Sequence, residues 1–583
     1  MRDASEAGWG NRVASLALFG LCLLPFLVPL RTLPTSSFYA EWLAFALGLA
    51  ALPALTGRAG LIIPRAILLP TGLCILLLLQ CLWLPSALRP VAWIGLLYLL
   101  WATLLMLITA AVLRDISVQR LARRLALALG LAALINACNV ILFQAGLRTG
   151  LEWGFLHTDR AGNLGQANML ADLLWLGIVS VLYCWHGSRG NGWRYAAWLA
   201  PLLVASALTG ARAPLLYALW VALAAALLCD ARMRRAAASV AVIYFAIVIF
   251  VYWLPVPIAG GSDSLSRMLP PGGMAAGAGA AGEAAASNIR VQLMAVAADI
   301  FLDHPWLGAG WGSFAWESFS RADDLRGTMM VGEHAHQLFF QLAADLGIAA
   351  PVLVLAALCG WALPIWRARR DLRADPAHWW AVSAAGVMLL HSQLEYPLWY
   401  AHTLGLLAIV LACSEQRKWR FEAWRGSTLA VGAVMAAGAW LLAGSIIDYR
   451  RLEQWMYADM RRGAAAAPAG HYQVLGELSR DSLLRPQAVR ALAAVMLPTR
   501  EQLDGKLEVC RLALRSEPQT PAVFSCALLD ALAGDTALAE RNMRQARRVF
   551  ENEFQDYRRR LKSDLTPAQL AEHRRLLDLP AQE

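Results

Sequence analysis

The stretch EHAHQLFFQLAADLGIAAPVLVLAAL, residues 333–358, places two histidines and a glutamate in front of a segment apolar enough to lie in lipid. Within it Gln337, Gln341 and Asp345 follow one another at intervals of four residues, which places them along one face of a helix. Polar and ionisable side chains inside a membrane span are costly and by default mark a functional site or its support. The stretch therefore predicts a membrane helix whose polar face looks into a helix bundle or a wet cavity.

The whole chain has the composition of a membrane protein. Of its 583 residues 58% are hydrophobic and 16% are charged, and its mean hydropathy is +0.49. Globular domains are about a quarter charged, and runs of about 20 apolar residues cross a bilayer. The first run is expected to be a span and not a cleaved signal. We predict an all-α polytopic membrane protein with about thirteen transmembrane helices, at residues 13–30, 38–56, 66–84, 91–113, 125–146, 169–186, 195–209, 213–229, 238–258, 336–365, 378–394, 397–413 and 427–447.

Alternate loops between these spans differ in their basic residues. One set holds most of the loop arginines, whereas the short loops of the other set hold only Arg31, Arg89, Arg148, Arg160 and Arg212. Loops rich in Lys and Arg stay in the cytoplasm, so the bias predicts a cytoplasmic N-terminus. An odd number of spans then predicts a periplasmic C-terminal segment on a protein of the bacterial inner membrane. The formal net charge of +10 follows from these loops and does not indicate a nucleic-acid partner.

The predicted spans divide the chain into four parts. Residues 1–258 form an N-terminal membrane half, residues 259–335 a large periplasmic loop, and residues 336–447 a C-terminal membrane half. Residues 448–583 predict a periplasmic α-helical domain of short helix pairs, similar to tetratricopeptide packing. Cys510 and Cys526 in that domain are either a disulfide or two buried thiols.

Polar residues collect in the loops predicted to face outward. The stretches are HTDRAGNLGQANMLAD (157–172), TGARAP (209–214), NIR (288–290), EHAHQ (333–337) and HSQLEYPLWYAH (391–402). The predicted cytoplasmic loops carry arginine and little else. The residues capable of chemistry are therefore expected near one membrane surface. We find no metal-binding motif in these stretches.

These motifs resemble one family. RAGNLGQANMLADLL (160–174) resembles a signature of bacterial protein glycosylation ligases, and AHQLFFQLAADLGIAA (335–350) resembles a motif of the O-antigen ligase and polymerase superfamily. HSQLEYPLWY (391–400) and PTSSFYAEW (34–42) are similar to further segments of those ligases. Together they resemble the PglL-type O-oligosaccharyltransferases. The chain departs from the family at four positions, where Gln337 replaces Asn, Ala167 replaces Pro, Asp345 replaces Glu and Ala211 replaces Ser.

The resemblance implies a GT-C-like fold and a reaction. Such enzymes move an oligosaccharide en bloc from an undecaprenyl-diphosphate carrier to a hydroxyl of an exported protein such as pilin. They need no cofactor and no metal, the lipid-linked glycan being a substrate, and attack opposite the diphosphate inverts the anomeric centre.

Side chains suited to this chemistry follow from the motifs. Arginine binds phosphate bidentately and stays charged, so three outward arginines are expected to bind the donor diphosphate: Arg160, Arg212 and Arg290. Imidazole titrates near neutral pH, so His336 is the expected general base, with Glu395 and His391 as orienting catalytic groups. Supporting polar roles fall to Gln166, Asn168, Gln337, Gln341, Asp345 and Tyr396.

Other interpretations fit parts of the pattern. An O-antigen ligase acting on lipid A–core, or a Wzy-type polysaccharide polymerase, would use a glycan acceptor instead of a protein. A transporter would show inverted repeats, which we do not find. His336 could make only structural hydrogen bonds, and the arginines could merely reach toward the interface. Trp306, Trp311 and Trp316 either lie in the interfacial belt or stack on glycan.

Overall fold

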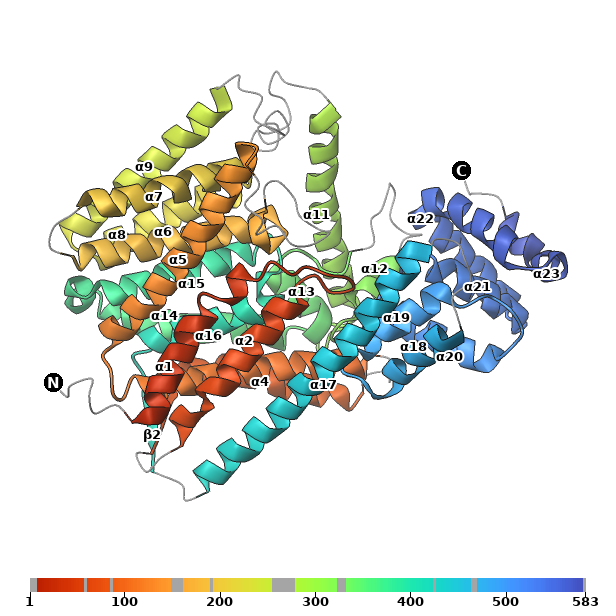
Figure 1. The fold of residues 1–583 in the computed structure, drawn as a ribbon, viewed down its shortest axis with the longest axis horizontal. Helices are drawn as coiled ribbons and strands as arrows, with labels where there is room; N and C mark the ends of the chain where they lie inside the picture. Colours follow the sequence, from red (N-terminus) through yellow and green to blue (C-terminus); the bar gives the residue numbers. More distant parts are fainter. Residues whose placement is uncertain are drawn as a thin grey trace. The chain divides into compact units, whose positions relative to one another are not determined.

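The computed structural model describes residues 8–56, 60–83, 88–147, 161–188, 192–253, 278–321, 332–422, 426–462 and 469–579. Helices dominate the described parts (Figure 1), as predicted. The chain divides into two compact units, described separately below. The first unit comprises Met1–Leu73, Tyr98–Ser287 and Leu353–Leu442, and the second comprises Cys74–Leu97, Asn288–Val352 and Ala443–Glu583.

Each predicted span lies on helical structure. Eight helical segments are long and apolar enough to cross a membrane: Trp9–Leu27, Phe38–Leu55, Arg89–Val112, Val118–Gln144, Ala167–His186, Ala231–Val251, Ala349–Arg367 and Ser427–Tyr457. The remaining predicted spans correspond to shorter helices: α3 (Leu68–Cys81), α7 (Gly192–Leu208), α8 (Ala213–Leu228), α15 (Pro376–His391) and α16 (Ala401–Ser414). The chain is therefore a multi-pass, all-α membrane protein.

The prediction of one continuous span over residues 336–365 is wrong. The structure breaks it into α13 (Leu338–Leu346) and the candidate span α14 (Ala349–Arg367). The break falls at Gly347, whose φ of 72° is a left-handed conformation that glycine adopts without steric cost. A Cβ atom there would lie 2.3 Å from the carbonyl oxygen of Trp306. Gln341 and Asp345 consequently belong to a short separate helix outside the span.

The first unit is built around α6 (Ala167–His186), which is buried along nearly its whole length. Helices α5 (Val118–Gln144), α7, α8, α9 (Ala231–Trp253) and α15 pack against it. The same hydrophobic core includes residues of α1 (Trp9–Leu21), α2 (Phe38–Ala51), α4 (Arg89–Val112) and α16. Helices α5, α6 and α7 run side by side in Figure 1. Short 3₁₀ turns at residues 25–27, 52–55, 65–67, 162–164, 371–374 and 397–399 connect the helices. Asp172 is the one carboxylic acid in α6, and a buried carboxyl needs a partner inside the bundle.

Loops predicted to share the cytoplasmic side contact one another. The strands β1 (Leu61–Pro64) and β2 (Lys418–Phe421) form an antiparallel pair in which Leu61 lies opposite Phe421 and Pro64 opposite Lys418. Gln119 likewise donates to Asp375 at 2.6 Å. Each contact joins two loops of the arginine-rich set, so the two loops of each pair lie at the same end of the bundle. Their cytoplasmic location stays a prediction.

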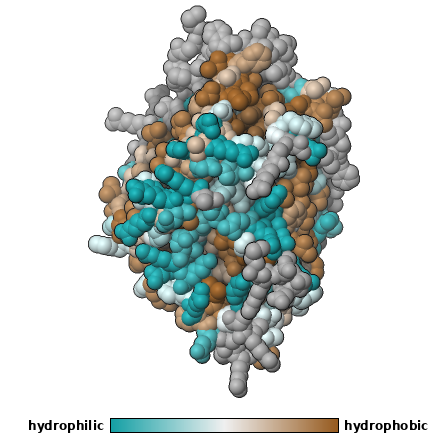
Figure 2. Space-filling model, turned by 90° about the vertical axis from the view of Figure 1, so that its left-hand side faces the viewer, coloured by the Kyte–Doolittle hydropathy of each residue, from teal (hydrophilic) through white to brown (hydrophobic). Residues whose placement is uncertain are grey.

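One end of the first unit carries a polar surface. Figure 2 shows hydrophilic side chains gathered on this face, with hydrophobic ones around them. Exposed arginines Arg232, Arg234 and Arg235 lie at the start of α9, which is at this end in Figure 1. A polar end on an apolar bundle is the arrangement expected where membrane helices emerge into water.

The second unit joins part of the predicted large loop to the predicted C-terminal domain. It contains most of α11 (Ala278–Asp303), α12 (Phe314–Ser320) and α13, and the continuation of α17 (Ser427–Arg462) into the tail. The tail helices are α18 (Ala469–Asp481), α19 (Arg485–Val495), α20 (Leu503–Ser516), α21 (Ala522–Leu532), α22 (Thr536–Asp564) and α23 (Pro567–Leu577). Their tetratricopeptide character stays a prediction.

Residues of α12 belong to the tail's hydrophobic core. Phe319 is buried among tail side chains, and the guanidinium of Arg515 lies 4.8 Å from the ring centroid of Trp316. Gln545 donates to the carbonyl of Ser320 at 3.1 Å. The loop segment and the tail therefore form one packed body. Trp316, which is half-buried, packs on this body, and stacking of its ring on glycan stays a prediction.

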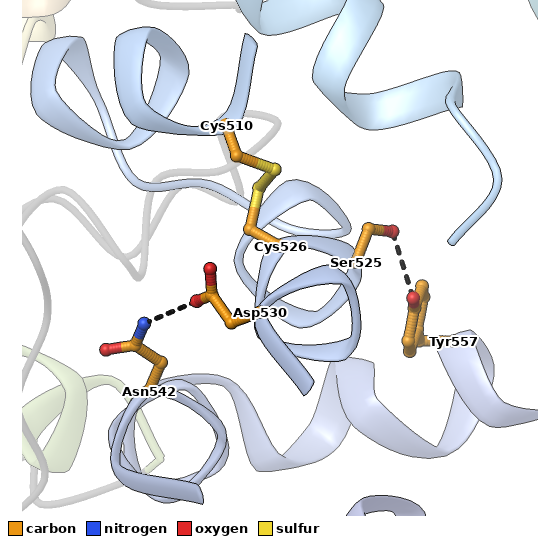
Figure 3. Close-up of a disulfide and its surroundings, with 6 residues drawn as sticks. All are labelled: Cys510, Ser525, Cys526, Asp530, Asn542 and Tyr557. Carbon is orange, nitrogen blue, oxygen red and sulfur yellow. Dashed lines mark hydrogen bonds between the residues drawn. A yellow bond between two sulfur atoms is a disulfide. The ribbon is translucent and has the colours of Figure 1, made fainter. Parts of the chain in front are cut away.

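A disulfide joins Cys510 of α20 to Cys526 of α21, with Cα atoms 5.6 Å apart (Figure 3). The structure thus decides between the two states that the sequence left open. Beside it Ser525 and Tyr557 share a hydrogen bond of 2.9 Å, and Asn542 donates to Asp530 at 3.0 Å. These bonds link α21 to α22, so the helix pairs of the tail are joined covalently and by buried polar contacts.

Candidate functional site

Amide side chains organise the start of α13. The Gln337 side chain caps the helix by accepting from the Phe340 backbone N–H at 2.7 Å. The Gln341 amide accepts from the Ala335 backbone at 2.6 Å and donates to the Asp345 carboxyl at 2.9 Å. The predicted shared face is therefore correct for Gln341 and Asp345, whereas Gln337 turns to the helix end. These bonds hold the backbone on both sides of residue 336.

His336 itself has an unusual backbone. Its φ is 53°, in the left-handed region that residues other than glycine rarely adopt. Such a conformation costs about 1–3 kcal/mol and persists only where the surroundings impose it, typically at functional sites. The side chain is partly exposed. The neighbouring hydrogen bonds of Ala335 and Gln337 are the surroundings that impose it here.

The far end of α13 is held by Gln80, a residue that the sequence analysis missed. Its Nε2 donates to the carbonyls of Leu307 at 2.8 Å and Asp345 at 2.7 Å, and its Oε1 accepts from the Trp311 N–H at 3.0 Å. Gln80 is buried near the end of the apolar run LLLLQC in α3. A single amide in such a run was the available signal, because a buried amide must have partners.

A glycine permits the close packing that this clamp needs. Gly308 has a φ of 69°, and a Cβ atom there would lie 2.3 Å from the carbonyl carbon of Asp345. The segment around Gly308 therefore lies backbone against backbone on the end of α13, where the Ala309 N–H donates to the carbonyl of Ala344 at 2.8 Å.

The Asp345 carboxyl is 2% exposed. Burial raises its pKa to about 7, while hydrogen bonds from Gln341 and from the Gly312 backbone act in the opposite direction. Removal from water disfavours the charged form, and two neutral donors do not compensate for it. Asp345 is thus a hydrogen-bonding residue of the fold that titrates near neutral pH.

The tail reaches the EHAHQ stretch through Arg490 of α19. Burial lowers the pKa of this guanidinium, and the nearby Glu333 carboxylate acts to raise it. Arg490 also pairs with Glu517 of the tail. Arg490 therefore interacts with the carboxylates of both Glu333 and Glu517, and so links the stretch before His336 to the C-terminal helices.

A second polar cluster lies inside the first unit. Asp172 of α6 accepts from the Tyr217 hydroxyl at 2.7 Å and is hydrogen-bonded to Nδ1 of His391. All three side chains are buried, and Nε2 of His391 has no hydrogen-bond partner among the residues that the structure describes. The sequence placed His391 near the chemistry, and the structure pairs it with Asp172.

One turn earlier on α6, Asn168 donates to the Glu395 carboxylate at 3.2 Å. The Glu395 backbone N–H donates in turn to the carbonyl of His391 at 2.9 Å. The ring of Tyr396 stacks on that of Tyr400 with centroids 6.3 Å apart. The motifs at 160–174 and 391–400, far apart in sequence, therefore contact each other directly.

Gln166 occupies the N-cap position of α6, but its side chain makes no capping hydrogen bond. The turn before it is held by asparagines that the sequence analysis did not consider. Asn139 donates to the Asn163 side chain at 3.3 Å, and Asn136 accepts from the Asn163 backbone at 3.3 Å. Arg31 donates through Nε to the Asn163 carbonyl.

The three arginines predicted for the donor diphosphate have different placements. Arg212 is exposed directly before α8 in the first unit, and Arg290 is exposed on α11 in the second unit. Arg160 lies outside the described residues. His336 belongs to the second unit, whereas His391 and Glu395 belong to the first. Convergence of these groups on one pocket therefore stays a prediction. Over the described ranges we find no group of three or more metal-ligating side chains.

Two protein-family models match the chain. The family described as O-Antigen ligase matches residues 195–355, and the family described as Virulence factor membrane-bound polymerase, C-terminal, matches residues 379–562. A comparison with curated proteins gave no match. The first match contains EHAHQ and the second contains HSQLEYPLWYAH. Together they support the O-antigen ligase and Wzy polymerase superfamily, whose members of the ligase and polymerase type are membrane enzymes that transfer glycans. They do not single out the PglL-type enzymes.

Proposed function

We propose that the protein is an O-oligosaccharyltransferase. It moves an oligosaccharide en bloc from an undecaprenyl-diphosphate donor to Ser or Thr hydroxyls of an exported protein such as pilin. The observation that carries this proposal is the backbone of His336, a left-handed residue held between two hydrogen-bonded neighbours at the head of a short helix. A backbone fixed in this way limits where the partly exposed imidazole can lie, which supports its proposed role as the general base.

The reaction follows from the groups present. The acceptor hydroxyl oxygen attacks the anomeric carbon while its proton passes to His336. The bond from that carbon to the diphosphate oxygen breaks, and the diphosphate leaves with the electron pair. Attack opposite the leaving group inverts the anomeric centre. Arg160, Arg212 and Arg290 are the proposed partners of the departing charge, because preorganised cations at a developing anion lower barriers strongly.

Glu395 and His391 act as orienting groups in this proposal. The Glu395 carboxylate accepts a hydrogen bond from Asn168, and the His391 ring is hydrogen-bonded to Asp172. Both side chains therefore have defined positions before substrate binds. Preorganisation of this kind avoids the cost of ordering side chains during the reaction.

The protein is proposed to lie in the inner membrane with its C-terminal helices in the periplasm. The loop arginine bias supports a cytoplasmic N-terminus, and the Cys510–Cys526 disulfide supports an oxidising compartment for the tail. C-terminal fusions to alkaline phosphatase and to a cytoplasmic fluorescent reporter test this. Phosphatase activity is expected. Fluorescence of the cytoplasmic reporter without phosphatase activity would show that the C-terminal helices lie in the cytoplasm.

A second candidate is a polymerase or ligase that uses a glycan acceptor. A long helical tail would suit a protein acceptor. However, the family model described as a polymerase matches residues 379–562 and so includes most of the tail. As far as the tail is concerned, this match favours a glycan acceptor over a protein acceptor.

The two candidates are separated by the acceptor. The purified chain in nanodiscs would be incubated with undecaprenyl-diphosphate-linked oligosaccharide and one of three acceptors: a pilin, lipid A–core or a second lipid-linked glycan. Glycosylated pilin, found by mass spectrometry, is the expected product. Transfer to lipid A–core or to glycan alone would favour the second candidate.

His336→Ala is expected to abolish transfer while the protein still inserts. His304→Ala, at an exposed position of the same unit, is the matched control and should retain full activity. Full activity of His336→Ala would remove His336 from the role of base. EDTA should leave the rate unchanged, and inhibition reversed by Mg²⁺ or Mn²⁺ would contradict the metal-free mechanism.

A further inference from the structure

The candidate span α14 has a stripe of exposed apolar side chains along one side. They recur at intervals of three or four residues, the spacing of one helix face: Ile348, Val352, Leu355, Cys359, Leu363 and Trp366. The helix has 19 residues, which extend about 28 Å at 1.5 Å per residue, close to the roughly 30 Å of a hydrocarbon core. A span of this length places Ile348, directly before its first residue, at the edge of the hydrocarbon.

The two ends of α14 differ in their aromatic residues. Trp366 lies in the last turn, and the guanidinium of Arg369 lies 4.1 Å from its ring centroid. Tryptophan is enriched at membrane–water interfaces, where its ring lies at the level of the lipid headgroups. The first part of the helix, Ala349 to Gly360, contains no aromatic residue. An interfacial aromatic side chain at that end must therefore come from another segment of the chain.

The loop of residues 305–311, which follows α11, lies against the end of α14 that lacks an aromatic residue. The Ile348 N–H donates to the carbonyl of Pro305 at 2.9 Å. A Cβ atom at Gly347 would lie 2.3 Å from the carbonyl oxygen of Trp306, so the two backbones are in contact. The Trp306 side chain is 77% exposed. The loop therefore brings an exposed indole to the start of the exposed stripe on α14.

Leucines on both sides of Trp306 extend the exposed apolar surface. Leu302 is 71% exposed and Leu307 is 47% exposed. Asp303, which lies between Leu302 and Trp306 in sequence, pairs instead with Arg321 of α12 at 2.7 Å. The large apolar side chains are thus exposed to the surroundings, whereas the charged neighbour is paired within the protein. Contiguous exposed apolar surface of this kind marks a contact with another protein or with a membrane.

The protein itself satisfies much of the backbone of this loop. The N–H groups of residues 308–311 donate, at 2.8–3.2 Å, to the carbonyls of His304, Ala344 and Asp345 and to the amide oxygen of Gln80. The Leu307 carbonyl accepts from the same Gln80 side chain at 2.8 Å. A loop in water can leave such groups to the solvent, but backbone near lipid needs partners in the protein. Gln80 therefore supplies what a loop at the membrane surface requires.

We propose that the loop of residues 305–311 lies in the interfacial layer of the membrane, with Trp306 inserted among the lipids. The exposed apolar side chains continue from α14 through Ile348 to Trp306, and this continuity with a membrane span identifies the bilayer as the partner of the surface. Because the same loop is hydrogen-bonded to the end of α13, that helix is held at the membrane surface. The contact is with lipid alone and does not rest on the proposed function.

Photo-crosslinking tests the contact directly. The full chain would carry p-benzoylphenylalanine in place of Trp306 or, in a second sample, in place of Leu302. It would be irradiated in nanodiscs of phosphatidylethanolamine and phosphatidylglycerol without any glycan, and its adducts would be identified by mass spectrometry. A phospholipid adduct is expected at both positions. Leu538 of α22 is the matched control, because it is a 41% exposed leucine of the same unit, and the label there should give no adduct.

A charge in place of the indole provides a second test. With the label at Leu302, Trp306→Asp should reduce the yield of phospholipid adduct, because a carboxylate is costly to bring into lipid. Trp306→Phe, which keeps an aromatic ring, should preserve the yield. Leu538→Asp adds the same charge away from the proposed surface and should leave the yield at Leu302 unchanged.

The outcomes separate lipid from the other partners of such a surface. Absence of phospholipid adducts at both Trp306 and Leu302, or an equal yield at Leu538, would overturn the proposal. When undecaprenyl-diphosphate-linked oligosaccharide is added, the phospholipid adduct at Trp306 should persist. Its replacement by a glycan adduct would show that Trp306 stacks on glycan instead. Phospholipid adducts in a chain that transfers glycan to no acceptor would overturn the proposed function and leave the membrane contact standing.

Discussion

The imidazole of His391 is hydrogen-bonded to the carboxyl of Asp172, 219 residues earlier in the chain. One partner comes from the end of α15 and the other from the second turn of α6, at the centre of the first unit. This pair and the Asn168–Glu395 bond attach the HSQLEYPLWYAH segment to the RAGNLGQAN segment.

Replacement of Asp172 by alanine is expected to destabilise the protein strongly. His391 and the Tyr217 hydroxyl would both lose their acceptor in a buried environment. Loss of one partner of a buried pair costs about 3–5 kcal/mol. Denaturant unfolding in detergent measures this change in the free energy of unfolding. Asp230→Ala is the control, since Asp230 pairs with His186 at a surface position and caps α9 by accepting from the Met233 N–H, contacts that together contribute about 1–2 kcal/mol. Equal losses of unfolding free energy in the two variants would contradict a buried Asp172–His391 pair that stabilises the fold.

Gln80→Leu should loosen the segment that faces the end of α13. The change preserves size but leaves the Leu307 carbonyl and the Trp311 N–H without the partner that they have now. Each buried group left unsatisfied costs roughly 1–3 kcal/mol. Hydrogen–deuterium exchange over residues 304–312 should increase, and transfer activity should fall through displacement of α13. Gln119→Leu, which removes an exposed amide, should change neither. Unaltered exchange in Gln80→Leu would show that the clamp is not needed.

Gly308→Ala is expected to disrupt the same contact by a steric route. The new methyl group would meet the backbone of Asp345 at 2.3 Å, at a φ of 69°. Left-handed backbone alone costs about 1–2 kcal/mol for alanine, and the clash adds to that cost. Gly360→Ala in α14 has no atom within 4 Å and should be neutral or stabilising by about 0.5–1 kcal/mol. Thermal unfolding of the two variants, side by side, tests the packing; a neutral Gly308→Ala would refute it.

The stability of the second unit should depend on pH through Asp345. The pKa is raised in the folded state to about 7 from an ordinary value of 3.8, so the folded state holds a proton that the unfolded state has released. The stabilisation is fully present below pH 4 and is lost as the pH rises through about 7. Asp345→Asn, which mimics the neutral acid, should make the melting temperature depend less on pH in this range. Melting temperatures between pH 4 and pH 8 provide the measurement, and identical slopes for wild type and variant would count against the buried neutral acid.

The sequence by itself determined the class of the protein and the neighbourhood of its polar residues. Runs of about 20 apolar residues have few stable states other than membrane helices, so the multi-pass helical fold could be predicted. The intervals between Gln341 and Asp345 also predicted their contact, because a helix brings residues four apart together. The charge of the loops predicted which of them share one side of the membrane, but not which of them pair.

Other features depended on contacts between distant segments. Gly347 ends α13 where hydropathy continues unbroken, because its conformation is set by the Trp306 backbone lying against it. Gln80 gave no motif, since its partners are backbone groups 227–265 residues away. The local sequence shows the periodicity and polarity of a segment. The partner of a buried polar group is decided only when distant segments pack together. Tertiary structure therefore decided which polar residues, such as Gln80 and Asp172, find their hydrogen-bond partners far away in the sequence.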